Sequence, residues 1–153
     1  MKVKVILLAL AVFFVGAVVG SAQGPHMGTW KLNEAKSKFA GKARNNTVVY
    51  EAAGDMTKVT VDGVDSSGGA THHDWTGKFD GKYYAINGST TADQRSYTRV
   101  NSRTLRFREQ KAGKVVLTGT ITVARNGKIR TVSTSGLDSK GKWVHNTAVY
   151  DKQ

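Results

Sequence analysis

From residue 28 onward the chain alternates apolar and polar residues with a period of two, and glycine interrupts this alternation at short intervals. Such alternation is typical of β-strands that bury one face. One short helical turn is expected within residues 33–40, where Asn33 is suited to cap it. The alternation predicts ten strands, near residues 28–33, 46–52, 56–63, 70–79, 82–86, 93–100, 103–110, 114–124, 128–136 and 142–151.

The breaks between these segments carry turn residues. Asn126-Gly127 is typical of a tight type I′ hairpin, in which both central residues have positive φ. Four more breaks have similar chemistry: Gly54-Asp55, Asp80-Gly81, Ala112-Gly113 and Lys140-Gly141. Because loops this short leave no room for crossover helices, the sheet must be antiparallel. We therefore predict an all-β fold, a single antiparallel up-and-down barrel of 8–10 strands.

An internal repeat points to the same fold. When the chain is shifted by 73 residues, residues 47–73 align with residues 120–146 without a gap and with eight identities. Many of the identities lie at turns, among them the pairs Asp65/Asp138 and Gly68/Gly141. Convergence on common turn residues explains them equally well. If the repeat is real, the sheet contains two similar three-strand meanders.

The first 22 residues have the features of a secretory signal peptide. Lys2 and Lys4 precede an apolar stretch over residues 5–19, and small residues follow up to Ala22. The apolar stretch is shorter than the roughly 20 residues that a membrane-spanning helix needs, which argues against the alternative of a membrane anchor. We expect cleavage after Ala22, one barrel domain over residues 23–153, and a secreted or periplasmic location in a bacterium.

Composition narrows the class of partner. The chain has no cysteine, which excludes disulfides and lipidation at a signal-peptide cysteine. Its net charge of +12 favours anionic surroundings such as lipid headgroups or polysaccharides. We do not expect nucleic acid, because the aromatic residues do not interleave with basic ones as a stacking platform requires. The basic residues are scattered, and we expect them on a solvated barrel exterior: Lys36, Lys38, Lys42, Arg44, Arg95, Arg99, Arg103, Arg106 and Arg108.

Both ends of the barrel region resemble a known family. Residues 28–32 read Gly-Thr-Trp-Lys-Leu, which resembles the first strand of calycins, the lipocalins and intracellular fatty-acid-binding proteins. Residues 147–152 are similar to the last strand of the fatty-acid-binding proteins, Thr-Arg-x-Tyr-Glu-Lys, whose arginine and tyrosine bind the ligand carboxylate. Tyr150 occupies the tyrosine position and Ala148 the arginine position. Residues 31–39 also resemble small exported bacterial proteins that begin Gly-Thr-Trp-Lys-Leu-Asn-x-Ala-Lys-Ser-Lys-Phe.

The resemblance implies a calycin-like barrel that can enclose a small ligand. In such a barrel Trp30 closes one end and stacks on a cation from a late strand. If Tyr150 points inward, as its match implies, strand alternation turns Ala148 and Asn146 inward with it. The repeat aligns Asn146 with His73, so the residues on that face of the 70–79 strand point inward too.

The inward residues form a candidate ligand site. Leu105 and Phe107 alternate with Arg106 and Arg108, so the apolar pair is expected inside. Ligand pockets are mostly apolar with a few placed polar groups. We therefore propose a ligand-binding set: His73, Trp75, Phe79, Phe107, Asn146 and Tyr150. The alternative, that these residues simply fill the core, stays open.

Arg130 is the remaining interior candidate. By the repeat it shares a face with Val132 and Thr134, which makes it an inward cation or a strand-end arginine that faces solvent. Of these two, the sequence favours the solvent-facing arginine.

Catalytic and metal patterns are weak. In His72-His73-Asp74 neighbouring side chains point to opposite faces of a strand, so the two histidines cannot chelate one ion. His72 and Asp74 share a face and provide at most a weak surface metal site. The sequence has no Gly-x-Ser-x-Gly elbow and no phosphate-cradling loop that opens a helix. We expect no enzymatic activity, no metal site and no cofactor.

Taken together, these features predict an exported, monomeric, non-enzymatic barrel that binds a small apolar or amphipathic ligand, anionic ligands included. Two alternatives remain: a surface binder of polyanions such as lipopolysaccharide or acidic glycans, and a structural module without a ligand. We expect neither nucleic-acid binding nor stable membrane insertion.

Overall fold

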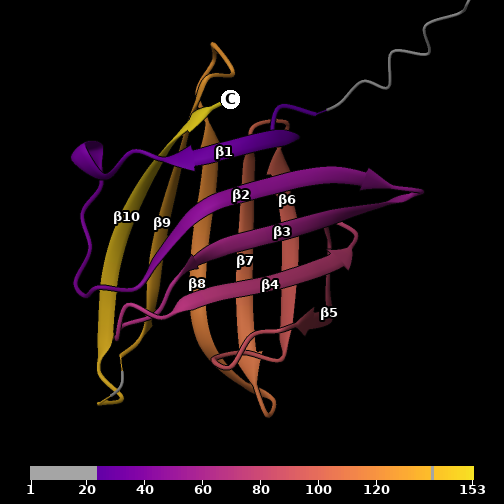
Figure 1. Cartoon of the computed structure of the whole chain (residues 1–153). Helices are drawn as coiled ribbons and strands as arrows, with labels where there is room; N and C mark the ends of the chain where they lie inside the picture. Colours follow the sequence, from indigo (N-terminus) through magenta and orange to yellow (C-terminus); the bar gives the residue numbers. More distant parts are fainter. Residues whose placement is uncertain (1–23, 139) are drawn as a thin grey trace, which may run out of the picture.

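Residues 24–138 and 140–153 are described by a computed structural model, and the expected signal peptide lies outside them (Figure 1). The strand positions expected from the alternation are confirmed to within two residues. The elements are β1 (Gly28–Leu32), the 3₁₀ turn η1 (Glu34–Lys36), β2 (Arg44–Ala53), β3 (Met56–Val64), β4 (Ala70–Gly77), β5 (Asp80–Asn87), β6 (Gln94–Asn101), β7 (Thr104–Lys111), β8 (Lys114–Val123), β9 (Ile129–Leu137) and β10 (Trp143–Lys152).

The strands close into one antiparallel barrel in the order β1-β10-β9-β8-β7-β6-β5-β4-β3-β2. Closure occurs at β1, where Trp30 is paired with Val48 on β2 and with Lys152 on β10 (Figure 1). Each strand therefore has a neighbour on both sides, although β4 and β5 pair only at Asp74–Asn87 and Trp75–Ile86. The predicted barrel is therefore confirmed, at the upper end of the expected strand number. Within the described residues, no helix is long and apolar enough to cross a membrane.

The two halves of the sequence repeat form matching meanders, β2-β3-β4 and β8-β9-β10. Asp65 Oδ1 accepts hydrogen bonds from the backbone N–H groups of Ser67 and Gly69, at 2.8 and 2.9 Å. Asp138 Oδ1 accepts from Lys140 and Lys142 at the same two distances. The two turns have the same hydrogen-bond pattern 73 residues apart, which confirms the expected pair of meanders.

The predicted type I′ turn at Asn126-Gly127 is wrong. Among the described non-glycine residues, only Ala112 has a positive φ, of 48°. At the β8–β9 connection the Gly127 N–H instead donates to the Ala124 carbonyl at 2.9 Å, and Gly127 alone has positive φ. The Ala124 N–H donates a hydrogen bond to the Ile129 carbonyl, so the loop between β8 and β9 is longer than two residues. The two-residue turn with positive φ at both positions lies at Ala112-Gly113, between β7 and β8.

The short turn after β1 is also as expected. Asn33 caps η1, and its Oδ1 accepts from the Lys36 N–H at 3.2 Å. Beyond it Lys38 forms an isolated bridge with Thr147 on β10. This segment contains no helix pair that could cover the barrel mouth among the described residues.

Trp30, on β1, belongs to the buried core. Its side chain is fully buried, and its Nε1–H donates to the His26 carbonyl at 2.8 Å. Two cations from late strands lie over its ring, the Lys152 ammonium at 5.3 Å and the Arg130 guanidinium at 5.8 Å from the ring centre. The expected contact of this tryptophan with a cation from a late strand is therefore confirmed.

Candidate ligand site in the barrel interior

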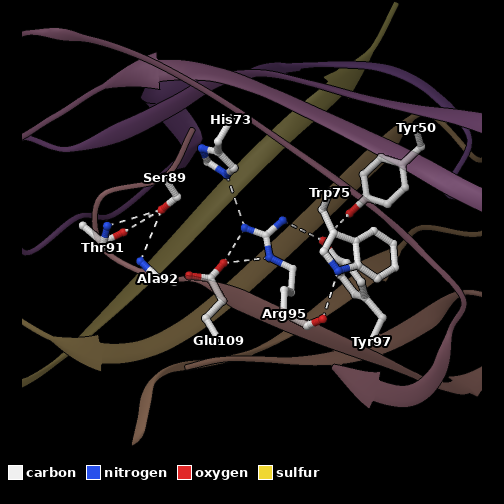
Figure 2. Close-up of polar contacts among 9 residues, drawn as sticks. All are labelled: Tyr50, His73, Trp75, Ser89, Thr91, Ala92, Arg95, Tyr97 and Glu109. Atoms are coloured by element: carbon white, nitrogen blue, oxygen red, sulfur yellow. Dashed lines mark hydrogen bonds and ion pairs between the residues drawn. The ribbon is translucent and has the colours of Figure 1, made fainter. Parts of the chain in front are cut away.

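Arg95 and Glu109 form a buried ion pair in the barrel interior (Figure 2). On β6, alternation turns Arg95 and Tyr97 inward, and on β7 it turns Phe107 and Glu109 inward. Arg95 and Glu109 are direct partners across these two strands, and their side chains are almost fully buried. Arg95 Nε donates to Glu109 Oε1 at 2.7 Å, and Nη2 donates to the same oxygen. Within the core, the positive charge of Arg95 is therefore paired with the negative charge of Glu109.

This pair anchors a wider polar network (Figure 2). Arg95 Nη1 donates to the Tyr97 hydroxyl at 3.2 Å, and that hydroxyl lies 3.3 Å from the Tyr50 hydroxyl. On the other side Arg95 Nη2 lies 3.3 Å from His73 Nε2. The Trp75 Nε1–H donates to the Arg95 backbone carbonyl at 2.9 Å. Hydrogen bonds therefore run from β4 across β6 to β2.

The protonation states follow from burial and from these contacts. Burial lowers the pKa of His73, and the Arg95 guanidinium lowers it further, so His73 is neutral at pH 7. Burial raises the pKa of Tyr97, and Arg95 offsets only part of that rise. Burial alone lowers the pKa of Arg95, but the Glu109 carboxylate raises it, and the guanidinium stays charged. The network therefore has no net charge.

Arg130, on β9, is the second cation of the interior. Only 3% of it is exposed, so the solvent-facing orientation that the sequence favoured is wrong. Its guanidinium carbon lies 4.8 Å from the Tyr50 ring centre and 5.1 Å from that of Tyr150. Within the described residues, neither Nε nor Nη1 of Arg130 has a hydrogen-bond partner, and Arg130 forms no ion pair. Unlike Arg95, this arginine has no carboxylate partner among the described residues, and its guanidinium lies against aromatic rings.

A cavity of about 70 Å³ lies between Arg130 and the Arg95–Glu109 pair. With each water taking about 30 Å³, it has room for roughly two water molecules or a group of similar bulk. Its wall is aliphatic and aromatic apart from a few polar groups, and its lining residues are Asn45, Val48, Tyr50, Val59, Val61, Arg95, Tyr97, Phe107, Glu109, Leu117, Ile121, Arg130, Val132, Thr134 and Tyr150.

Two of the six residues proposed from the sequence line this cavity. Phe107 is on its wall, and Tyr150 is there with its hydroxyl donating to the Asn45 carbonyl at 3.0 Å. The burial of Tyr150 raises its pKa to about 12, although Arg130 lowers it, so the hydroxyl remains protonated.

The other four proposed residues lie elsewhere. His73 and Trp75 reach the network at Arg95, and Phe79 stacks on Trp75 with ring centres 6.4 Å apart. Asn146 accepts a hydrogen bond from the Ala40 N–H at 2.7 Å, outside the cavity wall.

Sequence reasoning missed the charged residues. Arg95 was expected on the exterior with the other basic residues, which is wrong, since it is 6% exposed. A signal was present, because the alternation that turns Leu105 and Phe107 inward also turns Glu109 inward. A buried carboxylate requires a cationic partner, and Arg95 shares an inward face with Tyr97 one strand away.

The His72–Asp74 surface site is not assembled. His72 Nδ1 lies 2.6 Å from Asp62 Oδ1, and Asp74 Oδ2 accepts from Asn87 Nδ2 at 3.3 Å. No group of three or more histidine or acidic side chains suited to hold a metal ion occurs in the described part of the chain.

Known proteins give only a distant comparison. No protein-family model matches the sequence, and no curated protein matches it. Among solved structures, this chain is similar to EF1p2_mFAP2b bound to DFHBI, with 12% identity and a TM-score of 0.48 over 84% of this chain and 94% of that one. It is also similar to mFAP1, a redesigned β-barrel bound to DFHBI, with 15% identity and a TM-score of 0.45 over 84% of this chain and 95% of that one. At such distances the likeness says nothing of what this chain binds.

Proposed function

We propose that this protein is an exported, non-enzymatic barrel that binds a small amphipathic anion, with the ligand's carboxylate on Arg130. The observation that supports this most is the guanidinium of Arg130, a residue on the cavity wall, whose Nε and Nη1 have no hydrogen-bond partner among the described residues. An unpaired buried charge costs several kcal/mol of folding free energy. A protein can carry this folding cost at a binding site, because a bound ligand then supplies the missing negative charge.

The contrast with Arg95 strengthens the proposal. The two arginines are equally buried, but only Arg95 has a carboxylate partner. A ligand carboxylate at Arg130 would complete a second ion pair and accept charge-assisted hydrogen bonds, the stronger class. The rings of Tyr50 and Tyr150 hold the guanidinium in place for that contact.

The cavity also sets the size and polarity of the ligand. A volume of about 70 Å³ has room for a carboxylate group with little beside it. Val59, Ile121 and Val132 supply the apolar wall. A longer chain requires a shift of Leu117, the only half-buried aliphatic residue on the wall.

A binding role fits these contacts better than catalysis. Nucleophilic catalysis requires a nucleophile within hydrogen-bond reach of a general base. In the described interior, the one histidine next to the network faces Arg95, and the tyrosine hydroxyls bond one another or a backbone carbonyl. The polar groups are thus arranged to hold a charge.

Calorimetric titration with sodium butyrate tests this proposal, with neutral butyramide as the matched ligand. We expect wild-type protein to bind butyrate and not butyramide, and Arg130→Met to bind neither. Arg125→Met is the control, because Arg125 is exposed in the β8–β9 turn, and it should bind butyrate as wild type does. Equal butyrate binding by wild type and Arg130→Met, or no butyrate binding by wild type, would overturn the proposal.

A further inference from the structure

The outer wall of the barrel carries a second polar surface. On β7 the inward Phe107 leaves Arg106 and Arg108 exposed on the outside. On β8 and β9 the outward positions are hydroxyl residues: Thr118, Thr120, Ser133 and Ser135. The exposed His145 on β10 extends this surface.

These residues are ordered in rows across four neighbouring strands. Arg108 pairs with Thr118, Thr118 with Ser135, and Ser135 with His145. A parallel row contains Arg106, Thr120 and Ser133. With strands about 4.8 Å apart, the first row, over four strands, is about 14 Å long, and the second, over three strands, is about 10 Å long. Strands β7 to β10 lie side by side, so the surface is continuous (Figure 1).

The two rows line a groove of about 490 Å³, together with Phe107, Gly119 and Thr134 between them. Twisted sheets make barrels hyperboloid in shape, which produces a shallow waist on the outer wall. Among the described residues, no carboxylate lines the groove, so its two arginines are not neutralised there. Beyond His145 on the same face of β10 lies Trp143, which is 47% exposed and paired with the exposed Leu137.

We infer that this outer groove binds an acidic oligosaccharide. The arginine pair suits the carboxylate or sulfate groups, since guanidinium binds planar oxyanions well. The hydroxyl rows donate to and accept from sugar hydroxyls, and Trp143 offers an exposed aromatic face at one end of the groove. Single-stranded nucleic acid fits less well, because it needs several aromatic platforms for successive bases. Phe107 and Thr134 line both the groove and the interior cavity, but the groove's arginines and hydroxyl groups are not part of the interior site, so this inference does not depend on the proposed ligand at Arg130.

The test uses the whole mature protein and a hexamer of galacturonic acid, followed by Trp143 fluorescence and calorimetry. Arg106→Gln with Arg108→Gln should weaken binding by on the order of tenfold or more, because two charge-assisted contacts are lost. The control removes the same charge at exposed turns, with Arg103→Gln and Arg125→Gln, and should change the affinity by less than about twofold, as a screened distant charge does. Equal weakening by both pairs would show general attraction of polyanions and overturn the inference.

A second variant tests for sugar recognition as opposed to charge alone. Thr118→Val with Thr120→Val keeps both arginines and favours strand structure, but removes two hydroxyl groups from the groove. We expect weaker binding of the hexamer, with an unchanged melting curve. Unchanged affinity in this variant would contradict the inference, as would tighter binding of a thymidine dodecamer or of anionic phospholipid vesicles than of the hexamer. Arg130→Met should bind the hexamer as wild type does.

Discussion

Replacing Arg130 by methionine should make the ligand-free protein more stable. Methionine keeps the apolar length of the side chain but removes the charge and the two donors that lack partners within the described residues. Each buried donor without a hydrogen-bond partner costs about 1–3 kcal/mol of folding free energy, so the two together cost about 2–6 kcal/mol. The cation–π contacts with Tyr50 and Tyr150, each worth about 1–2 kcal/mol, are lost in exchange. At the middle of these ranges about 4 kcal/mol is gained and about 3 kcal/mol is lost, so the balance favours the variant by about 1 kcal/mol.

Urea unfolding at pH 7.5 in a buffer free of carboxylates measures this difference. The variant should have a higher midpoint than wild type with the same slope, since the surface exposed on unfolding hardly changes. Added butyrate should then reverse the order. A ligand at 100 times its dissociation constant stabilises the protein that binds it by about 2.7 kcal/mol, and only wild type should gain this.

Glu109→Gln provides the internal comparison. It breaks a satisfied buried pair and leaves Arg95 without its carboxylate, a change that costs about 3–5 kcal/mol. A loss of similar size in Arg130→Met would refute our reasoning. It would mean that Arg130 is a structural contact for Trp30, Tyr50 and Tyr150, and the interior would then be a filled core.

Three further predictions concern the rest of the barrel. Burial, with help from Arg130 and Arg99, lowers the pKa of His26 from 6.5 to about 4. As the pH falls below 6.5, His26 therefore takes up a proton in the unfolded chain, whereas in the folded chain it does so only near pH 4. Stability should fall by about 3 kcal/mol between these two pH values in urea unfolding, and His26→Phe should remove most of that fall. Ala112→Gly should raise the free energy of unfolding by about 0.5–1 kcal/mol, because Ala112 has a φ of 48° that glycine adopts without strain; a loss of stability would contradict the turn geometry. Gly119→Ala should lower the melting temperature and cost about 2–3 kcal/mol, because its Cβ would lie 2.4 Å from Phe107 and 2.9 Å from the Ser133 carbonyl; a variant as stable as wild type would show that this strand pair is looser than described.

Alternation and turn residues were enough to predict the strands and the barrel. They work because each strand buries one face, and because glycine marks the loops. The inward orientation of Phe107 followed from the same alternation, and that of Tyr150 was implied by the resemblance of the last strand to the fatty-acid-binding proteins. The prediction for the turn at Asn126-Gly127 was wrong because the loop length depends on which residues of β8 and β9 pair. That register is set by tertiary packing and not by the turn residues themselves.

The charged interior was harder to foresee. Alternation places a residue on a face, but a buried arginine is acceptable only beside a carboxylate or aromatic rings. Arg95 lies opposite Glu109 only in the observed register of β6 and β7, and the rings around Arg130 come from strands at both ends of the sequence. Alternation also does not tell how far along the barrel axis a residue lies. It therefore did not distinguish Asn146, which contacts Ala40, from the residues on the cavity wall.

Nuclear magnetic resonance of the Arg130 Nε–H group tests the proposed ligand contact most directly. In ¹⁵N-labelled protein this signal is assigned by its loss in Arg130→Met, and sodium butyrate is then added stepwise. We predict a saturable downfield shift of the Nε–H proton with one-to-one stoichiometry, and no shift with butyramide. An Arg130 signal that stays unchanged up to saturating butyrate would contradict a carboxylate site in the barrel interior.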